Sequence, residues 1–280
     1  MSFETLIQPE ELLALMGSED LVTIDCRFDL AAPDSGRKRY IEQHLAGAVY
    51  ADLDQDMSGP PLTDQGRHPL PSPARMRQVF GRLGIDSTKQ VVVYDDRGGV
   101  PAARLWWMLK YMGHSAVALL DGGWEAWLEL VEQRRSEGEE QSLLHSGEQS
   151  NPPTQFSGQP FESWLVVLDQ VPQQRCLIDS RGQQRYSGEQ EPLDPVAGHI
   201  PGAVNHHYAA NLGADKKMKS PDELRQTFEA LFADSSPEEA TFYCGSGVSA
   251  CVNLLAAVHA GFPMSKLYVG SWSEWCQHAK

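Results

Sequence analysis

The chain has 280 residues, of which 41% are hydrophobic and 22% charged, the composition of an ordinary globular protein rather than a disordered one. This length predicts two domains, because one domain usually takes ~100–200 residues. The formal net charge of −15 argues against nucleic acid or an anionic membrane surface as a partner. Any anionic ligand must therefore be held by local arginines against a repulsive background.

Targeting segments and cysteine chemistry are also constrained by the sequence. No apolar run approaches the ~18–20 residues of a membrane span, so we expect no membrane partner. The first 17 residues lack a basic region and a small-residue cleavage site, which predicts no signal peptide and a cytoplasmic location. The five cysteines are an odd number and include no CxxC or Cys/His pairing, so we expect neither a disulfide framework nor a metal site.

Strand-like and helical patterns alternate along the whole chain. Alternating units of this kind predict an α/β fold, in which a mainly parallel sheet is flanked by helices. In chain order, we expect a short helix from Pro9, a strand at 21–27, a helix at 73–84, a strand at 90–96, a helix at 101–113, a strand at 115–123, a helix at 161–171, a strand at 176–181, a helix at 221–232, a strand at 240–245, a helix at 249–261 and a strand at 266–272.

The pattern is also a repeat. The landmarks His44, Asp95 and Trp124 of the first half return in the same order as His199, Cys244 and Trp272, at offsets of 155, 149 and 148 residues. Two copies of one domain explain this periodicity. The polar stretch between them is rich in Ser, Gly and Pro, which is typical of a linker. We therefore predict a first domain at 1–135, a linker at 136–159 and a second domain at 160–280.

Cys244 lies where a strand is predicted to end and a helix to begin, in 244-CGSGVS. Ligand sites of open parallel sheets lie beyond the carboxyl ends of their strands. Gly245 and Gly247 allow successive amides to turn inward, and a helix starting near Val248 would add its positive dipole end. These features lower a thiol pKa from ~8.5 and stabilise a persulfide anion. The first copy has Asp95 at this position, so we expect only the second to be catalytic.

The four other cysteines have no glycine loop. We expect Cys26, Cys176 and Cys251 to be buried structural residues, and Cys276, near the exposed C-terminus, to be a free thiol without an assigned role.

Two enzyme classes that use similar loops are disfavoured. A cysteine phosphatase needs an arginine six residues after its cysteine, and that position is Ala250. A serine hydrolase needs G-x-S-x-G, but the first position around Ser246 is Cys244. A non-catalytic binding module remains an alternative, which describes the first copy better than the second.

Over essentially its full length the chain resembles the tandem-domain rhodanese family of sulfurtransferases. The sequences 179-DSR, 198-GHIPGA, the cysteine loop and 270-GSWSEW match in order and spacing. The loop CGSGVS is similar to the CG[ST]GVT of 3-mercaptopyruvate sulfurtransferases, whereas thiosulfate sulfurtransferases usually carry basic residues there. The resemblance implies that Cys244 takes sulfur from mercaptopyruvate as a persulfide, releases pyruvate, and passes the sulfur to a thiol, thioredoxin or cyanide without a metal or organic cofactor. Transfer from thiosulfate is the alternative.

Further residues carry over from the resemblance. Arg185 matches an arginine that binds the anionic end of the substrate, and the loop residues Gly245, Gly247, Val248 and Ser249 would contact the substrate. Ser246 matches a serine that acts with a histidine and an aspartate of the first domain, here His68 and Asp54, at a site between the domains.

One position departs from the family pattern. Mercaptopyruvate enzymes usually have a second arginine after Glu-Pro, where this chain has Leu193. Losing one ionic hydrogen bond to a carboxylate costs ~1.5–3 kcal/mol. Arg104 and Lys216 are candidate replacements, and the preferred donor stays open at this point.

Overall fold

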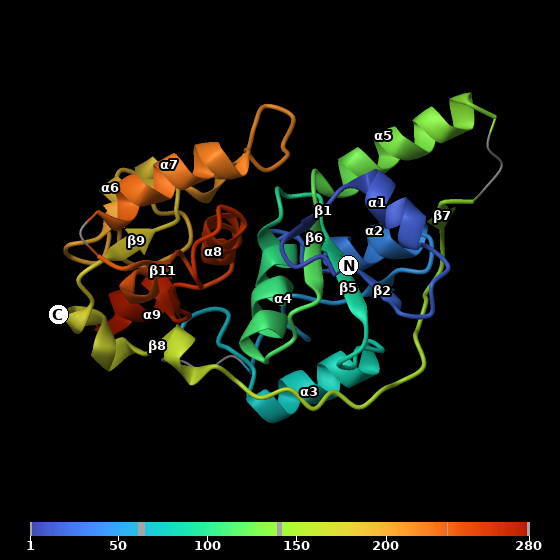
Figure 1. Ribbon diagram of the computed structural model, residues 1–280. Coiled ribbons are helices and arrows are strands. Elements are labelled where there is room, and N and C mark those ends of the chain that lie inside the picture. Colours follow the sequence, from blue (N-terminus) through green and yellow to red (C-terminus); the bar gives the residue numbers. More distant parts are fainter. Residues whose placement is uncertain (1, 61–64, 139–141, 234, 279–280) are drawn as a thin grey trace. The chain divides into compact units, whose positions relative to one another are not determined.

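The computed structural model describes residues 2–60, 65–138, 142–233 and 235–278, which form two compact units (Figure 1). The first unit contains Met1–Met57, Pro71–Pro160 and Asp215–Lys217, and the second contains Ser58–Leu70, Phe161–Ala214 and Met218–Lys280. Within the described ranges, no helix is both long and apolar enough to cross a bilayer.

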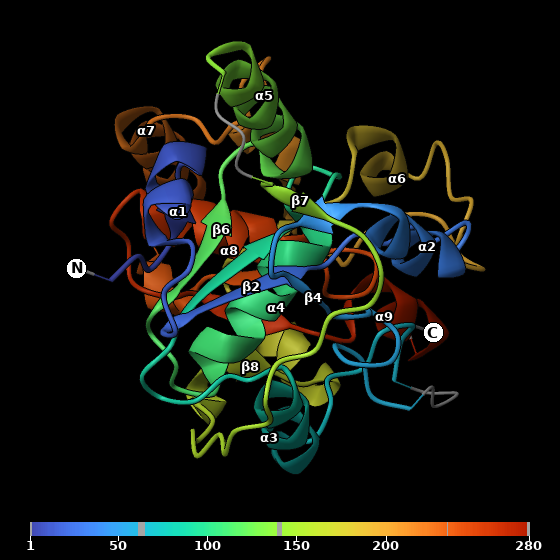
Figure 2. The same cartoon turned by 90° about the vertical axis from the view of Figure 1, so that its right-hand side faces the viewer.

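The first unit is built on a parallel sheet with the strand order β1-β6-β5-β2-β4. Figure 2 labels β6, β2 and β4 of this sheet. Its central strand is fully buried at all three valines from Val91 to Val93, which is expected for a parallel sheet covered on both faces. Helix α4 packs against β5 and β6, and α5 packs against β6. The elements are β1 Leu6–Ile7, α1 Pro9–Leu15, β2 Leu21–Asp25, α2 Asp34–Glu42, β4 Val49–Tyr50, α3 Pro73–Arg82, β5 Gln90–Tyr94, α4 Val100–Tyr111, β6 Val117–Leu120 and α5 Gly123–Ser136.

The second unit repeats this topology in a parallel sheet with the order β10-β9-β11-β12-β8. Helix α8 packs against the central strand β11 and against α7. The elements are β8 Leu165–Val166, β9 Leu177–Asp179, α6 Gln183–Ser187, β10 Val204–Asn205, α7 Pro221–Phe232, β11 Thr241–Tyr243, α8 Ala250–His259, β12 Lys266–Tyr268 and α9 Ser271–His278, with 3₁₀ turns at Glu162–Trp164, Leu168–Gln173, Tyr208–Asn211 and Pro237–Glu239.

Each unit has its own buried ion pair at the end of a corresponding strand, and this match confirms the repeat at the level of side chains. Arg27 pairs with Asp25 at 2.7 Å, and its guanidinium lies 4.4 Å from the ring centroid of Trp124. In the second unit, Arg181 pairs with Asp179 at 2.7 Å, and its guanidinium lies 4.9 Å from the ring centroid of Trp272. The predicted α/β fold with two tandem parallel-sheet domains is confirmed.

The helix predicted at 161–171 is wrong. This stretch forms the edge strand β8 between two 3₁₀ turns, and Leu165 pairs with Leu267 of β12. The run 165-LVVL contains adjacent β-branched residues, which favour a strand. Their pairing with β12 is a tertiary contact that the local sequence pattern cannot reveal.

The segment predicted as a linker, 136–159, is held against the first unit where the structure describes it. Strand β7 (Leu144–His145) pairs antiparallel with β3 (His44–Leu45). Farther along, the Thr154 N–H donates to the carbonyl of Gly81 in α3 at 2.9 Å. Figure 1 shows the segment passing along α3. The polar composition of this segment therefore reflects a surface strap with its own hydrogen bonds.

Asp95 occupies the loop position in the first unit that Cys244 occupies in the second. Its buried carboxylate accepts backbone N–H bonds from Arg97 at 2.7 Å, Gly99 at 2.9 Å and Ala102 at 3.0 Å. Burial raises the pKa of Asp95 to about 6, although these three N–H donors lower it. In the first unit, the N–H groups of this loop therefore donate to the Asp95 carboxylate, a side chain of the protein itself, rather than to a ligand.

The raised pKa of Asp95 predicts a pH-dependent contribution to stability. Because the folded state binds the proton more tightly than the unfolded state, this contribution is present at low pH and is lost as pH rises through about 6. An Asp95→Asn variant does not titrate there. We expect wild type to gain roughly 2–3 kcal/mol relative to this variant between pH 7.5 and pH 4. Urea unfolding of both proteins at several pH values measures the difference, and a pH-independent difference would contradict a raised pKa.

Candidate active site

Cys244 directly follows β11 and is held in place by the start of α9. It is buried, with 2% of its surface exposed. Its backbone N–H donates to Ser271 Oγ at 3.1 Å, and its carbonyl accepts from the Trp272 N–H at 3.0 Å. Helix α8 begins at Ala250, within two residues of the predicted start, so the whole stretch 245–249 forms a loop at this strand end.

The environment of Cys244 favours a thiolate. Burial acts to raise the pKa of the Cys244 thiol, but the Ser249 hydroxyl and the backbone N–H groups of Ser246 and Ala250 outweigh it, so the pKa is lowered. The negative charge of Asp179 is a smaller opposing effect. Because the thiolate is the nucleophilic form, a lowered pKa increases the fraction of Cys244 that can react at a given pH.

The Ser249 hydroxyl gives a direct test of this account. Replacing Ser249 with alanine removes the strongest of the interactions that lower the Cys244 pKa. We expect the pH of half-maximal alkylation by iodoacetamide to move upward, with the limiting rate at high pH little changed. An unchanged or lower midpoint would show that Ser249 does not stabilise the thiolate.

Gly247 has a steric reason to be glycine, and the space around Gly245 shows which side chains approach the loop. Gly247 has φ +75°, and a Cβ there would lie 2.5 Å from the carbonyl oxygen of Val269. A Cβ on Gly245 would lie 2.8 Å from Arg67 Nη2 and 3.3 Å from Arg185 Nη1. The residue after the cysteine thus lies directly beneath two guanidinium groups. Val248, the remaining predicted loop residue, is buried, so any substrate contact from it stays a prediction.

His68 and Ser246 meet in the second unit although 178 positions separate them. His68 Nδ1 lies 2.7 Å from Ser246 Oγ, and both side chains are buried. The segment Ser58–Leu70 that carries His68 clusters with the second unit rather than the first, and the Arg67 N–H donates to Ser273 Oγ at 3.1 Å. A histidine next to a serine can polarise the hydroxyl and tune it as a proton donor.

Asp54 belongs to the first unit, so its predicted role beside His68 stays a prediction. Its backbone N–H donates to Asp52 Oδ1 at 2.9 Å. Burial, and to a lesser extent the charge of Asp52, raise the pKa of Asp54.

A network of ion pairs surrounds Arg185. Arg185 Nη2 contacts Glu191 Oε1 at 2.7 Å and Asp194 Oδ2 at 3.0 Å. The other oxygen of Asp194 pairs with Arg67 Nη1, and Glu191 also pairs with Arg181 at 3.2 Å. Both carboxylates are almost fully buried, whereas the side chains of Arg185 and Arg67 remain 22% and 26% exposed. The two arginines can therefore reach a ligand while the carboxylates orient them.

The candidate replacements for the missing arginine are engaged in the first unit. Arg104 is fully buried in α4, with Nη2 3.4 Å from the carbonyl of Met57, and Lys216 forms an ion pair with Glu125. Arg67 was missed by the sequence reading. The one signal that could have indicated it is its position directly before His68.

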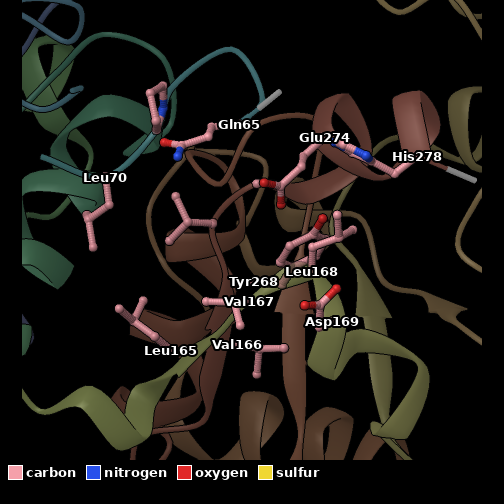
Figure 3. Close-up of a pocket in the computed structure, with 13 residues that line it drawn as sticks. Gln65, Leu70, Leu165, Val166, Val167, Leu168, Asp169, Tyr268, Glu274 and His278 are labelled. Carbon is pink, nitrogen blue, oxygen red and sulfur yellow. The ribbon is translucent and has the colours of Figure 1, made fainter. Parts of the chain in front are cut away.

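A cavity of about 440 Å³ lies elsewhere on the second unit (Figure 3). Gln65, Leu70 and Glu274 are among its lining residues, together with the stretches 165–169 and 268–270. None of the loop residues 244–249 lines it, so it is distinct from the cysteine site.

All five cysteines are buried, and each is a thiol outside any disulfide. This confirms the structural interpretation of Cys26, Cys176 and Cys251. Cys276 is also a free thiol, as predicted, but it is not exposed although it lies near the C-terminus. It is only 6% exposed and packs in the core of the second unit, and burial raises its pKa.

Two copies of one parallel-sheet domain, with a low-pKa cysteine in only one of them, define the tandem rhodanese-like class. The Rhodanese-like domain family matches residues 8–130 and 164–278. A probable 3-mercaptopyruvate sulfurtransferase of Pseudomonas aeruginosa is 43% identical over 98% of this chain and 96% of its own length. The thiosulfate sulfurtransferase of Rattus norvegicus is 38% identical over 92% of this chain and 86% of its own length.

A solved structure agrees with these sequence matches. The 3-mercaptopyruvate sulfurtransferase from Leishmania major superimposes with a TM-score of 0.82 at 30% identity, covering 99% of this chain and 75% of that one. The chain belongs to the rhodanese family.

Proposed function

We propose that the protein is a sulfurtransferase that moves sulfur from 3-mercaptopyruvate to a thiophilic acceptor through a persulfide on Cys244. The observation that carries this proposal is the 2.7 Å contact of His68 with Ser246, two residues from a cysteine whose pKa is lowered. The similarity to 3-mercaptopyruvate sulfurtransferases over nearly the full chain supports it.

The first half-reaction is a displacement at sulfur. The Cys244 thiolate attacks the donor thiol sulfur, an S–S bond forms, and the bond between sulfur and C3 of the donor breaks. The electron pair of the broken bond moves onto the pyruvyl group as an enolate. The enolate takes up the proton that the donor sulfur carried, so the products are pyruvate and the Cys244 persulfide anion.

Ser246 and His68 are assigned to the leaving enolate. A hydroxyl hydrogen bond to the developing enolate oxygen stabilises the transition state, and the histidine polarises that hydroxyl. The loop N–H groups and α8 would stabilise the persulfide anion. In the second half-reaction, a small thiol, thioredoxin or cyanide attacks the outer sulfur and restores the thiolate, in a ping-pong sequence.

Thiosulfate is the second candidate donor, favoured by Leu193 at the usual arginine position and by the match to a thiosulfate sulfurtransferase. With thiosulfate, sulfite leaves with the electron pair and no enolate forms. Ser246 and His68 would then have no enolate oxygen to stabilise. The buried contact between these two residues therefore favours mercaptopyruvate.

Comparing kcat/KM for the two donors, with cyanide as the common acceptor, tests the donor assignment. We expect mercaptopyruvate to be preferred. If the wild-type protein turned over thiosulfate alone, thiosulfate would replace mercaptopyruvate as the donor. If it formed no persulfide with either donor, the result would favour the binding-module alternative. A cytoplasmic location is part of the same proposal.

A further inference from the structure

The loop after Cys244 is bracketed by two arginines that come from different parts of the chain. Arg185 lies in α6, and Arg67 lies in the Ser58–Leu70 segment of the same unit. Their guanidinium groups approach Gly245 closely enough that a Cβ there would collide with Arg67 Nη2. A ligand that reaches the Cys244 sulfur past Gly245 therefore meets two cations.

Asp194 bridges the two arginines, because each of its carboxylate oxygens pairs with one of them. This buried carboxylate orients both guanidinium groups, but its negative charge also opposes an incoming anion. Arg67 Nε is buried and has no hydrogen-bond partner among the residues that the structure describes. A buried donor without a partner calls for an explanation, and a ligand bound against Arg67 would supply the missing acceptor.

Leu193, at the usual position of the second arginine, has 46% of its surface exposed. Its N–H donates to Glu191 Oε1 at 3.1 Å, so the turn that it forms still orders the carboxylates around Arg185. We propose that Arg67 replaces the arginine absent at position 193 and binds, together with Arg185, the carboxylate of the 2-oxo acid donor. This inference rests on the proposed function and names the residue that makes a carboxylate donor acceptable here. Planar guanidinium groups match a planar carboxylate, with each ionic hydrogen bond adding to affinity.

The first test is Arg67→Gln in the full-length protein. We expect KM for mercaptopyruvate to rise about 10–100-fold with kcat little changed, because the lost contact binds the donor away from the reacting sulfur. The matched control is Arg82→Gln, which also removes an arginine paired with a nearly buried aspartate, Asp56, but in the first unit. The control should keep wild-type KM. An unchanged KM in Arg67→Gln overturns the proposal.

A second variant separates ligand binding from a structural role for Arg67. If Arg67 only anchors Asp194, then Asp194→Asn should raise KM as Arg67→Gln does. If both arginines bind the donor, Asp194→Asn removes the opposing charge but keeps a side-chain oxygen that accepts from an arginine and holds it in place, so KM should fall several-fold. A raised KM in Asp194→Asn therefore overturns the proposal even if Arg67→Gln folds poorly.

Pyruvate, which has the carboxylate but no sulfur, keeps this test independent of the donor assignment. We expect pyruvate to inhibit wild-type turnover of either donor and to inhibit Arg67→Gln at least tenfold more weakly. If the wild type uses thiosulfate alone, the proposed donor fails while this comparison still measures carboxylate binding. Equal inhibition of the two proteins, or none of the wild type, overturns the role of Arg67.

Discussion

A Cys244→Ser protein is expected to lose sulfur transfer by roughly 10⁴-fold or more, the scale on which removal of a nucleophile acts in covalent catalysis. The serine hydroxyl would occupy the same buried loop, but it is not ionised at neutral pH and forms no persulfide. After incubation with mercaptopyruvate and removal of excess donor, the intact mass of wild type should rise by one sulfur atom. The mass of Cys244→Ser should not change.

Cys276→Ala is the matched control for this measurement. Cys276 is another buried free cysteine of the second unit, and burial raises its pKa where the loop lowers that of Cys244. The control protein should gain one sulfur as wild type does. A mass gain that persists in Cys244→Ser and disappears in Cys276→Ala would move the sulfur carrier to α9.

The second large effect concerns Ser246 and His68. Replacing Ser246 with alanine, or His68 with glutamine, should lower kcat for mercaptopyruvate by about 10²–10³, the usual cost of removing one donor to a developing oxyanion. Because the two side chains act through one hydrogen bond of 2.7 Å, the double variant should be little worse than the more damaging single variant.

Thiosulfate turnover by the same variants is the internal control. No enolate forms with this donor, so kcat should change by less than about threefold if Ser246 and His68 act on the enolate oxygen. Equal losses with both donors would instead mean that the pair maintains the Cys244 loop. Steady-state rates with each donor, measured on one preparation of each variant, separate the two results.

The sequence alone was sufficient to predict the features that depend on residues close together in the chain. A strand, a cysteine, a glycine loop and a helix follow one another within about 20 residues, so the loop could be recognised from local spacing. Gly247 is required by its own positive φ, and Ser249 lies five residues after the cysteine whose thiol it stabilises, in the same loop. The repeat was visible because each copy preserves the order of its landmarks.

The tertiary structure decided the features that depend on distant segments. The apolar spacing around Leu165–Val166 also suits a helix, but these residues form an edge strand because they pair with β12. His68 was assigned through family resemblance, but its contact with Ser246 and the position of Arg67 over Gly245 depend on where Ser58–Leu70 packs. An isolated arginine before a histidine carries no local pattern, since the carboxylate that orients it, Asp194, lies 127 residues away in sequence. The sequence determined where the reactive sulfur lies, and long-range packing determined which cations and which hydroxyl surround it.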